Sequence, residues 1–183
     1  MRCFIASKIK QSVLDEVVKI QNKLKTAGST TKWVKPENMH FTYHFLPNVS
    51  QDKIPVLKDV VSLCKSVEQF KIKLTHIGAF PSLKRPSVLW LGIEDKTSST
   101  TKIHEILKNG LQENGFDVDA RSYIAHLTIG RIRSSKNLNI LKKEILNLEF
   151  SLSEFTIDKV SLIESKLNSC GPLYENLYSI NLQ

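Results

Sequence analysis

The tripeptide His-x-Thr occurs twice in this chain, each time inside an apolar run typical of a β-strand. The two copies are residues 40–42 (His-Phe-Thr) and residues 126–128 (His-Leu-Thr). Because successive side chains of a strand point to opposite faces, each copy sets an imidazole and a hydroxyl against an apolar face that can be packed. The pattern requires a fold that buries one side of both strands and leaves the polar sides open.

The sequence around the two motifs also repeats. At the offset of 86 residues that separates the two motif histidines, strand patterns fall on strand patterns and helical patterns on helical patterns, as Cys3 falls on Leu89 and Ile54 on Ile140. Regular α+β chains match at many offsets by accident, but the coincidence of the two motifs favours an internal duplication. The repeated unit would run strand, helix, His-x-Thr strand, helix, strand.

The length of the chain suits one domain, residues 1–183. Duplication would divide it into lobes of about residues 1–86 and 87–183, related by a pseudo-two-fold axis. Such an axis would bring the two His-x-Thr strands face to face, so that each lobe contributes half of one cleft. Apolar residues make up 41% and charged residues 24% of the chain, as in ordinary globular domains.

Cysteine usage and hydropathy indicate the cellular compartment. The three cysteines form no CxxC pair, so neither a disulfide framework nor a zinc site is expected. Cys3 and Cys64 are interpreted as core residues and Cys170 as an unpaired turn residue. No apolar run is long enough to cross a bilayer, and the N-terminal run is too short for a secretory signal. We expect a cytoplasmic monomer with no membrane partner.

The formal net charge is +8 at pH 7. An excess of cations favours an anionic partner, such as a nucleic acid or a nucleotide, through long-range attraction. The lysines are scattered over helical segments, so a Lys-rich solvated surface is the alternative interpretation.

Hydrophobic periodicity predicts the elements of both repeats. Helices are predicted over residues 8–25, 52–68, 100–113 and 137–147. Strands are predicted in the two His-x-Thr segments and over residues 3–6, 70–74, 87–93, 150–163 and 173–182. Residues 33–36 are expected to form an extended connector.

Two histidines on opposite walls of one cleft suit acid–base chemistry at a phosphodiester. Displacement at phosphorus needs one proton removed from the attacking oxygen and one delivered to the leaving oxygen, and imidazoles with a pKa of about 6.5 can do both. Thr42 and Thr128 can donate to the non-bridging oxygens. Strict alternation puts Arg131 on the face opposite His126, so Arg131 reaches the phosphate only if the strand is irregular near Gly130. The scheme requires no metal or other cofactor.

The remaining histidines and one pair of basic residues have weaker signals. His44 would share the face of His40, either lining the cleft or solvated. His76 and His104 are expected to be exposed. Lys84 and Arg85 precede a proline in a loop, where they would either meet an RNA backbone or remain solvated.

Several aromatic residues of the strands are predicted to be core residues. Phe41, Tyr43 and Phe45 occupy the face opposite His40 and are interpreted as packed residues, not as platforms for stacking bases. Trp90 belongs to a nearly continuous apolar strand that we expect to be buried on both faces.

In these motifs and their flanking segments, the chain resembles the LigT-like RNA 2′,3′-cyclic phosphodiesterases of the two-histidine phosphoesterase superfamily. These proteins were historically called 2′-5′ RNA ligases. The resemblance runs essentially end to end. It rests on the segments MRCFIAS, WVKPENMHFTYHFL, GAFPSLKRPSVLWLGI, AHLTIGRIR, LIESKL and GPLYENLYSI. The chain differs from the usual family pattern at Tyr43, Pro47 and Ala125, and none of these differences removes a catalytic group.

The resemblance implies a bilobal, duplicated α+β fold, with two antiparallel-rich sheets flanked by helices around a central cleft. It also implies metal-independent opening of a 2′,3′-cyclic phosphate to a 2′-phosphate. In that reaction His40 would be the general acid for the departing 3′ oxygen and His126 the general base for water. Thr42 and Thr128 would hold the phosphate, and Arg131 matches the arginine that ends the second motif. The residues by themselves do not assign acid and base, because the two halves look alike.

The expected substrate is an RNA with a 2′,3′-cyclic phosphate end or a small cyclic nucleotide. Ligation or cleavage of 2′-5′ phosphodiesters in the same cleft is an alternative, because exchange at a cyclic phosphate can use a ribose hydroxyl in place of water. A non-catalytic RNA-binding module that retains the cleft is a second alternative. The presence of both complete motifs argues against a loss of activity.

Overall fold

Two antiparallel sheets, each covered by helices, form the α+β fold of the computed structural model, which describes residues 1–168 and 171–183. The first sheet has the order β3-β1-β8-β9. Its strands are β1 (Cys3–Lys8), β3 (His40–Leu46), β8 (Lys159–Asn168) and β9 (Gly171–Asn181). The second sheet has the order β2-β6-β5-β4-β7. Its strands are β2 (Thr31–Trp33), β4 (Phe70–Phe80), β5 (Val88–Glu94), β6 (His126–Ile132) and β7 (Phe155–Ile157).

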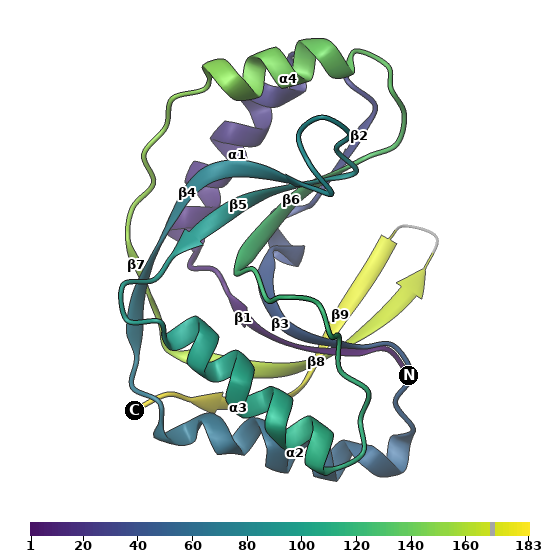
Figure 1. Ribbon diagram of the computed structural model, residues 1–183, viewed down its shortest axis with the longest axis vertical. Coiled ribbons are helices and arrows are strands. Elements are labelled where there is room, and N and C mark those ends of the chain that lie inside the picture. Colours follow the sequence, from purple (N-terminus) through teal and green to yellow (C-terminus); the bar gives the residue numbers. More distant parts are fainter. Residues whose placement is uncertain (169–170) are drawn as a thin grey trace.

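The helices pair across the repeats, as Figure 1 shows. The α-helices are α1 (Gln11–Lys25), α2 (Ile54–Ser62), α3 (Ser99–Glu113) and α4 (Leu138–Asn147). Short 3₁₀ turns are η1 (Pro36–Asn38), η2 (Gln51–Lys53) and η3 (Leu63–Ser66). In Figure 1, α2 and α3 lie together beside the first sheet, whereas α1 and α4 lie together beside the second. The two His-x-Thr strands, β3 and β6, are in contact where the sheets meet.

The duplication predicted from the sequence is present, and the repeats exchange a strand. The first unit runs β1-α1-β3-α2-β4 and the second runs β5-α3-β6-α4, followed by β7 and β8. The matching part of the first sheet has the order β3-β1-β8, and that of the second has the order β6-β5-β4. Thus β8 of the second repeat completes the first sheet, and β4 of the first repeat completes the second.

This exchange bears on the expected lobes, residues 1–86 and 87–183. The break near residue 86 separates the sequence repeats, but it does not separate the sheets. Antiparallel strands that are joined by a short loop pair readily, and β4 and β5 are joined in this way, with Gly78 opposite Trp90. β4 therefore occupies the edge of β5, and the corresponding edge of β1 is paired with β8.

The predicted stripe of α1 is buried, whereas in α4 Leu141 and Ile145 are buried but Ile140, predicted in the same stripe, is exposed. Val13, Val17 and Leu24 of α1 are buried in the main core, as the helical spacing requires. The predicted helix over residues 52–68 is divided into η2, α2 and η3. Pro55 lies in the first turn of α2, where its missing N–H leaves no helical hydrogen bond unmade, so the α-helix begins at that point.

Of residues 33–36, expected to be a connector, Trp33 ends the short strand β2, Pro36 begins η1, and only Val34 and Lys35 connect them. This strand pairs with the far end of β6, with Trp33 opposite Gly130. A Cβ atom at Gly130 would lie 2.9 Å from Thr31 Cγ2 and 3.1 Å from the Trp33 ring, so only glycine allows this approach. β4 extends to Phe80, beyond the predicted residues 70–74.

The structure tests the predictions made for the cysteines and for a membrane-spanning helix. Cys3 and Cys64 are free and buried, as predicted for core residues. Cys170 lies outside the described residues. Within the described part of the chain, no helix combines the length and the apolar content needed to cross a membrane.

Candidate active site

The two motif histidines lie at equivalent places in the two sheets. His40 is the first residue of β3 and His126 is the first residue of β6, and the next four positions have the same burial pattern in both strands. Both imidazoles line one cleft of about 600 Å³, together with Thr42 and Thr128. The structure therefore brings together the four polar side chains of the motifs, as the alternation and the duplication predict.

Each imidazole is oriented by a backbone carbonyl two residues before it. Nδ1 of His40 lies 2.8 Å from the carbonyl oxygen of Asn38, and Nδ1 of His126 lies 2.6 Å from that of Ile124. A carbonyl oxygen only accepts hydrogen bonds, so each Nδ1 carries a proton. In the neutral ring Nε2 is then unprotonated, which leaves each residue with one nitrogen able to accept or deliver a proton.

Aromatic rings surround the His40 imidazole. Phe4 stacks on it with ring centroids 4.5 Å apart, and Tyr174 meets it edge-on at 5.2 Å. Burial lowers the pKa of His40 to about 4, although the hydrogen bond to Asn38 acts in the opposite direction. The ring is therefore neutral at pH 7 in the free protein.

A second set of aromatic rings surrounds His126. Phe80 meets its ring edge-on at 4.9 Å, and the Trp90 ring lies at 5.9 Å. Burial lowers the pKa of His126 below its usual value, the hydrogen bond to Ile124 raises it in part, and the charge of Arg131 lowers it. Trp90 is buried, as predicted, and it corresponds to Phe4 at the offset of 86 residues.

A β-bulge brings Arg131 to the cleft. In the pairing of β5 with β6, Trp90 lies opposite Thr128 but Leu89 lies opposite Gly130, so Ile129 is an extra residue. One extra residue reverses the alternation beyond it. Arg131 consequently lines the same cleft as the two histidines. The irregularity expected near Gly130 is therefore present, with Ile129 as its inserted residue.

An equivalent bulge in β3 overturns two predictions. Ile5 pairs with His44 but Ala6 pairs with Thr42, so Tyr43 is the extra residue. His44 consequently leaves the face of His40 and is only 5% exposed, although the alternation predicted it on that face. Phe45, predicted to be a core residue, is 52% exposed for the same reason. Phe41 and Tyr43, which precede the reversal, are buried as predicted.

The predictions for the other basic residues have mixed outcomes. His104 of α3, expected to be exposed, is only 7% exposed because its ring packs against β3. His76 is exposed, as predicted. Lys84 and Arg85 lie in the loop between β4 and β5, as predicted, and are not among the residues that line the cleft. Among the described residues, no group of three or more His, Cys, Asp or Glu side chains is placed to hold a metal ion.

The rims of the cleft differ from each other, and the sequence analysis missed both. One rim, on and beside β2 and β6, is basic and carries Lys32, Lys35, Arg131 and Arg133. The other rim, on the β8–β9 hairpin, is largely apolar and carries Leu167, Pro172, Leu173 and Tyr174. The available signals were the closely spaced arginines after the second motif and the apolar residues of the closing strands.

Comparison with known proteins identifies the family. The family described as LigT like Phosphoesterase matches the chain twice, over residues 8–90 and over residues 91–174. The chain belongs to this family. The two matches coincide with the two sequence repeats, and each LigT-like repeat contains one of the cleft histidines.

Relatives of this LigT-like chain are similar over nearly their whole length. An RNA 2′,3′-cyclic phosphodiesterase of Methanocaldococcus jannaschii is 34% identical over 176 residues, which are 96% of this chain and 97% of that protein. A protein of the same name from Methanothermobacter thermautotrophicus is 32% identical over 181 residues, 97% of this chain and 96% of that protein.

Solved structures share the LigT-like fold. The protein TT0787 of Thermus thermophilus superposes with a TM-score of 0.83 at 22% identity, covering 100% of this chain and 98% of that one. LigT of E. coli in its apo form superposes with a TM-score of 0.79 at 18% identity, covering 99% and 96%. These two likenesses establish the bilobal α+β fold.

Proposed function

We propose that this LigT-like phosphoesterase hydrolyses the 2′,3′-cyclic phosphate at an RNA end, or in a small cyclic nucleotide, to a 2′-phosphate. The observation that carries the proposal is the placement of two similarly oriented imidazoles, His40 and His126, in one cleft with two threonine hydroxyls. Both relatives described above are named RNA 2′,3′-cyclic phosphodiesterases, which supports the opening of a 2′,3′-cyclic phosphate.

The proposed reaction uses one histidine on each side of the phosphorus atom. Nε2 of His126 accepts a proton from water while the water oxygen forms a bond to phosphorus. The bond from phosphorus to O3′ breaks, and Nε2 of His40 delivers its proton to that oxygen. His40 must be protonated before this step, and the negative charge of the bound phosphodiester favours its imidazolium form. The scheme balances without a metal ion.

The unequal rims support this assignment of acid and base. Tyr174, which touches the His40 ring, belongs to the apolar hairpin rim with Leu167 and Leu173. An apolar rim suits the ribose and base of the terminal nucleotide, so O3′ would face His40. Water would then approach from the side of His126.

The phosphate would be held by the remaining polar residues of the cleft. The hydroxyls of Thr42 and Thr128 would donate to the two non-bridging oxygens, which gain charge during displacement. Arg131 would neutralise part of that charge from the end of β6. Lys32 and Arg133, farther along the basic rim, would contact the preceding phosphates of an RNA chain.

Replacement of each histidine by alanine tests the proposal. His40→Ala and His126→Ala should each lower kcat on a nucleoside 2′,3′-cyclic phosphate by ~10²–10⁴-fold, because each removes one proton transfer. The matched control is His76→Ala, since His76 is exposed and does not line the cleft. The assay is run in chelator, and the product is identified by chromatography. Retained turnover in both cleft variants, or a 3′-phosphate product, would refute the mechanism.

A substrate panel tests the finer proposals. Cyclic mononucleotides, RNA with a cyclic-phosphate end and 2′-5′-linked oligomers are compared at equal concentration. We expect the highest kcat/KM on the RNA end, because only RNA reaches the cations beyond Arg131. Preference for 2′-5′ linkages, or tight binding with no turnover, would instead support one of the alternative functions.

We also propose that the protein acts as a cytoplasmic monomer. The two sequence repeats of a single chain supply both histidines and both threonines of the cleft, and Cys3 and Cys64 are free thiols, which suits a reducing compartment. Light scattering of the active protein tests the oligomeric state, and a stable dimer would contradict this part of the proposal.

A further inference from the structure

Three parallel rings lie between α3, β3 and the segment that precedes β6. His104 of α3 stacks on His44 of β3 with centroids 4.3 Å apart and planes 9° apart. On its other side, His104 stacks on Tyr123 with centroids 4.1 Å apart and planes 8° apart. We name these three residues the His44–His104–Tyr123 stack. It lies outside the cleft, and the proposed reaction makes no use of it.

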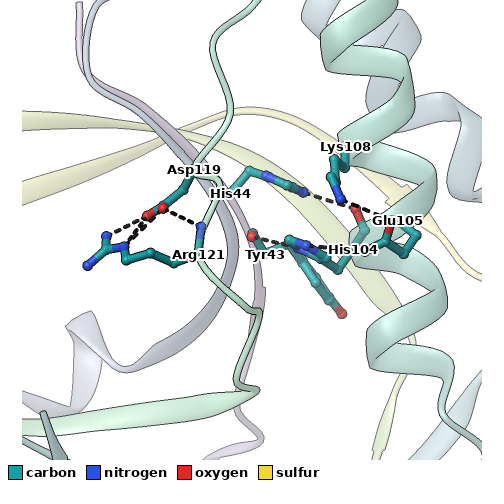
Figure 2. A network of polar contacts seen from close by, with 7 residues as sticks. All are labelled: Tyr43, His44, His104, Glu105, Lys108, Asp119 and Arg121. Atoms are coloured by element: carbon teal, nitrogen blue, oxygen red, sulfur yellow. Dashed lines mark hydrogen bonds and ion pairs between the residues drawn. The ribbon is translucent and has the colours of Figure 1, made fainter. Parts of the chain in front are cut away.

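The two histidine rings of the stack are held by two reciprocal hydrogen bonds, each from one ring to a backbone carbonyl of the other element. Nδ1–H of His104 donates to the carbonyl oxygen of Tyr43 at 3.2 Å, and Nε2–H of His44 donates to the carbonyl oxygen of His104 at 3.0 Å. Figure 2 shows Tyr43 and His44 of β3 meeting His104 of α3 in this way. Because both imidazoles are held at defined nitrogens, His104 offers Tyr123 a rigid surface.

The segment that carries Tyr123 has few polar supports, and besides Tyr123 it packs against the core through Phe116 and Val118. Residues 114–125 have no helix or strand, and no backbone-to-backbone hydrogen bond is found for residues 117–125 within the described part of the chain. The local contacts are an Asp119–Arg121 ion pair and a hydrogen bond from the Arg121 N–H to Asp119. Both partners lie in the same segment, so neither contact ties it to the core.

This segment supplies the carbonyl group that orients His126. Ile124 follows Tyr123 directly, its side chain is exposed, and its carbonyl oxygen lies 2.6 Å from Nδ1 of His126. The carbonyl that orients His40 is better supported, because Asn38 belongs to η1 and its N–H donates to Lys35 O at 2.9 Å. The position of the Ile124 carbonyl, which orients His126, therefore depends on side-chain packing. The position of the Asn38 carbonyl, which orients His40, is fixed by a backbone hydrogen bond.

We propose that Tyr123, stacked on His104, is a positioning residue that holds the Ile124 carbonyl against Nδ1 of His126. It thereby keeps the His126 proton on Nδ1 and its Nε2 facing the cleft. The consequence for turnover rests on the proposed function. The consequence for the His126 tautomer in the free protein does not, so the two are tested separately.

The Tyr123 hydroxyl provides a conservative variant. The hydroxyl is buried and has no hydrogen-bond partner among the described residues. Tyr123→Phe keeps the stacked ring and removes only this unpaired group, so it should not weaken folding. Tyr123→Leu removes the stacked ring but retains an apolar side chain. His104→Leu keeps Tyr123 and removes the ring on which it stacks.

The primary measurement is nitrogen NMR of the histidine rings in the free protein. Wild type and Tyr123→Phe should show His126 protonated on Nδ1. Tyr123→Leu and His104→Leu should show a mixture of tautomers and a lower pKa for His126, because the Ile124 carbonyl raises that pKa. His40 should be unchanged in all of them. The charged groups nearest the stack are Asp95, Glu105, Lys108 and Asp119, and all four are kept.

The secondary measurement is turnover of a nucleoside 2′,3′-cyclic phosphate. Both leucine variants should lose ~10–10²-fold in kcat with little change in KM, because a misplaced base affects the chemical step. The matched control is Phe116→Leu, since Phe116 packs from the same segment against the core but lies farther from His126 in sequence. It should keep the wild-type tautomer.

Three outcomes would overturn the positioning role. They are an unchanged His126 tautomer and pKa in Tyr123→Leu, equal effects of Tyr123→Phe and Tyr123→Leu, and an equal effect of Phe116→Leu. A changed tautomer in a protein that does not hydrolyse cyclic phosphates would support the positioning role and refute the proposed reaction. Thermal unfolding of each variant confirms that folded protein is compared.

Discussion

The strands β3 and β6 carry the same motif on nearly the same backbone, but their surroundings differ. Each begins with its histidine, and each has a bulge at the equivalent position, at Tyr43 in β3 and at Ile129 in β6. Two positions beyond the bulge, β3 exposes Phe45 where β6 directs Arg131 to the cleft. The shared features place two imidazoles and two hydroxyls in one cleft, and the differences make the two sides of that cleft unequal.

The bulges also differ in the side chain that donates to the carbonyl of the extra residue, although the Ile129 carbonyl also accepts from the Val34 N–H at 3.0 Å. In β6, the Gln21 amide of α1 donates to the carbonyl oxygen of Ile129 at 2.8 Å. In β3, the His104 imidazole of α3 donates to the carbonyl oxygen of Tyr43 at 3.2 Å. Each helix belongs to the other sequence repeat. An amide does not titrate in the physiological range but an imidazole does, so only the β3 bulge depends on a titratable group.

The largest effect that tests this comparison comes from the two threonines. Thr42→Val and Thr128→Val should each lower kcat by ~10²–10³-fold, because each removes one donor to an oxygen that gains charge in the transition state. Steady-state kinetics on a cyclic mononucleotide measures the losses. Thr156→Val, a half-buried hydroxyl of β7 outside the cleft, is the control. If one cleft threonine proved dispensable, the symmetric placement of the phosphate would be wrong.

A smaller effect is expected at the residues that follow the bulges. Arg131→Met should lower kcat/KM by ~10–10²-fold, the equivalent of losing a charge-assisted hydrogen bond of about 1.5–3 kcal/mol. Phe45→Met, at the equivalent position of β3, should leave kcat/KM unchanged because Phe45 does not line the cleft. Equal losses in both variants would show that the substrate contacts both sides symmetrically.

The smallest effect concerns stability and pH. Burial lowers the pKa of His40, His44, His104 and His126 in the folded protein, whereas unfolded histidines titrate near 6.5. As pH falls through 6.5, the unfolded chain binds protons that the folded protein does not, so the free energy of unfolding decreases. The stabilisation that comes from keeping these four histidines neutral is therefore fully present only above pH 6.5. Urea titrations at pH 7.5, 6.5 and 5.5 should show this decline.

The variant His104→Gln connects the pH effect to the difference between the bulges. It places an amide donor at the β3 bulge, as Gln21 provides at the β6 bulge. The variant should fold, and its stability should decrease less than that of wild type over the same pH range. A decline as steep as that of wild type would show that the stack does not contribute to the acid sensitivity.

The sequence predicts well the features that depend on neighbouring residues. Alternation correctly places Phe41 and Tyr43 in the core, and helical spacing correctly places the buried stripe of α1. Alternation fails from His44 onward, because a bulge depends on the register with β1, a partner far away in the sequence. For Arg131 the sequence does show that an irregular strand is needed, because a cation would help at the phosphate and strict alternation directs Arg131 away from it.

The pairing of strand edges also cannot be predicted from the sequence pattern, because it joins residues that are far apart in the chain. The periodicity reveals that β4 and β8 exist, but not that they exchange sheets. β2 contains only Thr31–Trp33, too short a run to show alternation, and yet it carries part of the basic rim. The sequence around Tyr123 does not predict its role, because the position of Tyr123 depends on how the His104 ring of α3 packs against His44 of β3.

The exchanged strands have a consequence for how the protein is made. During synthesis β1 and β3 leave the ribosome early, but the strand that covers the other edge of β1 is β8, near the end of the chain. At ordinary translation rates this edge of Cys3–Lys8, an almost wholly buried segment in the finished fold, stays uncovered for on the order of ten seconds. The nascent protein must therefore shield this unpaired edge until β8 has been synthesised, and cutting the loop between β4 and β5 would leave two fragments that each lack a strand of their sheet.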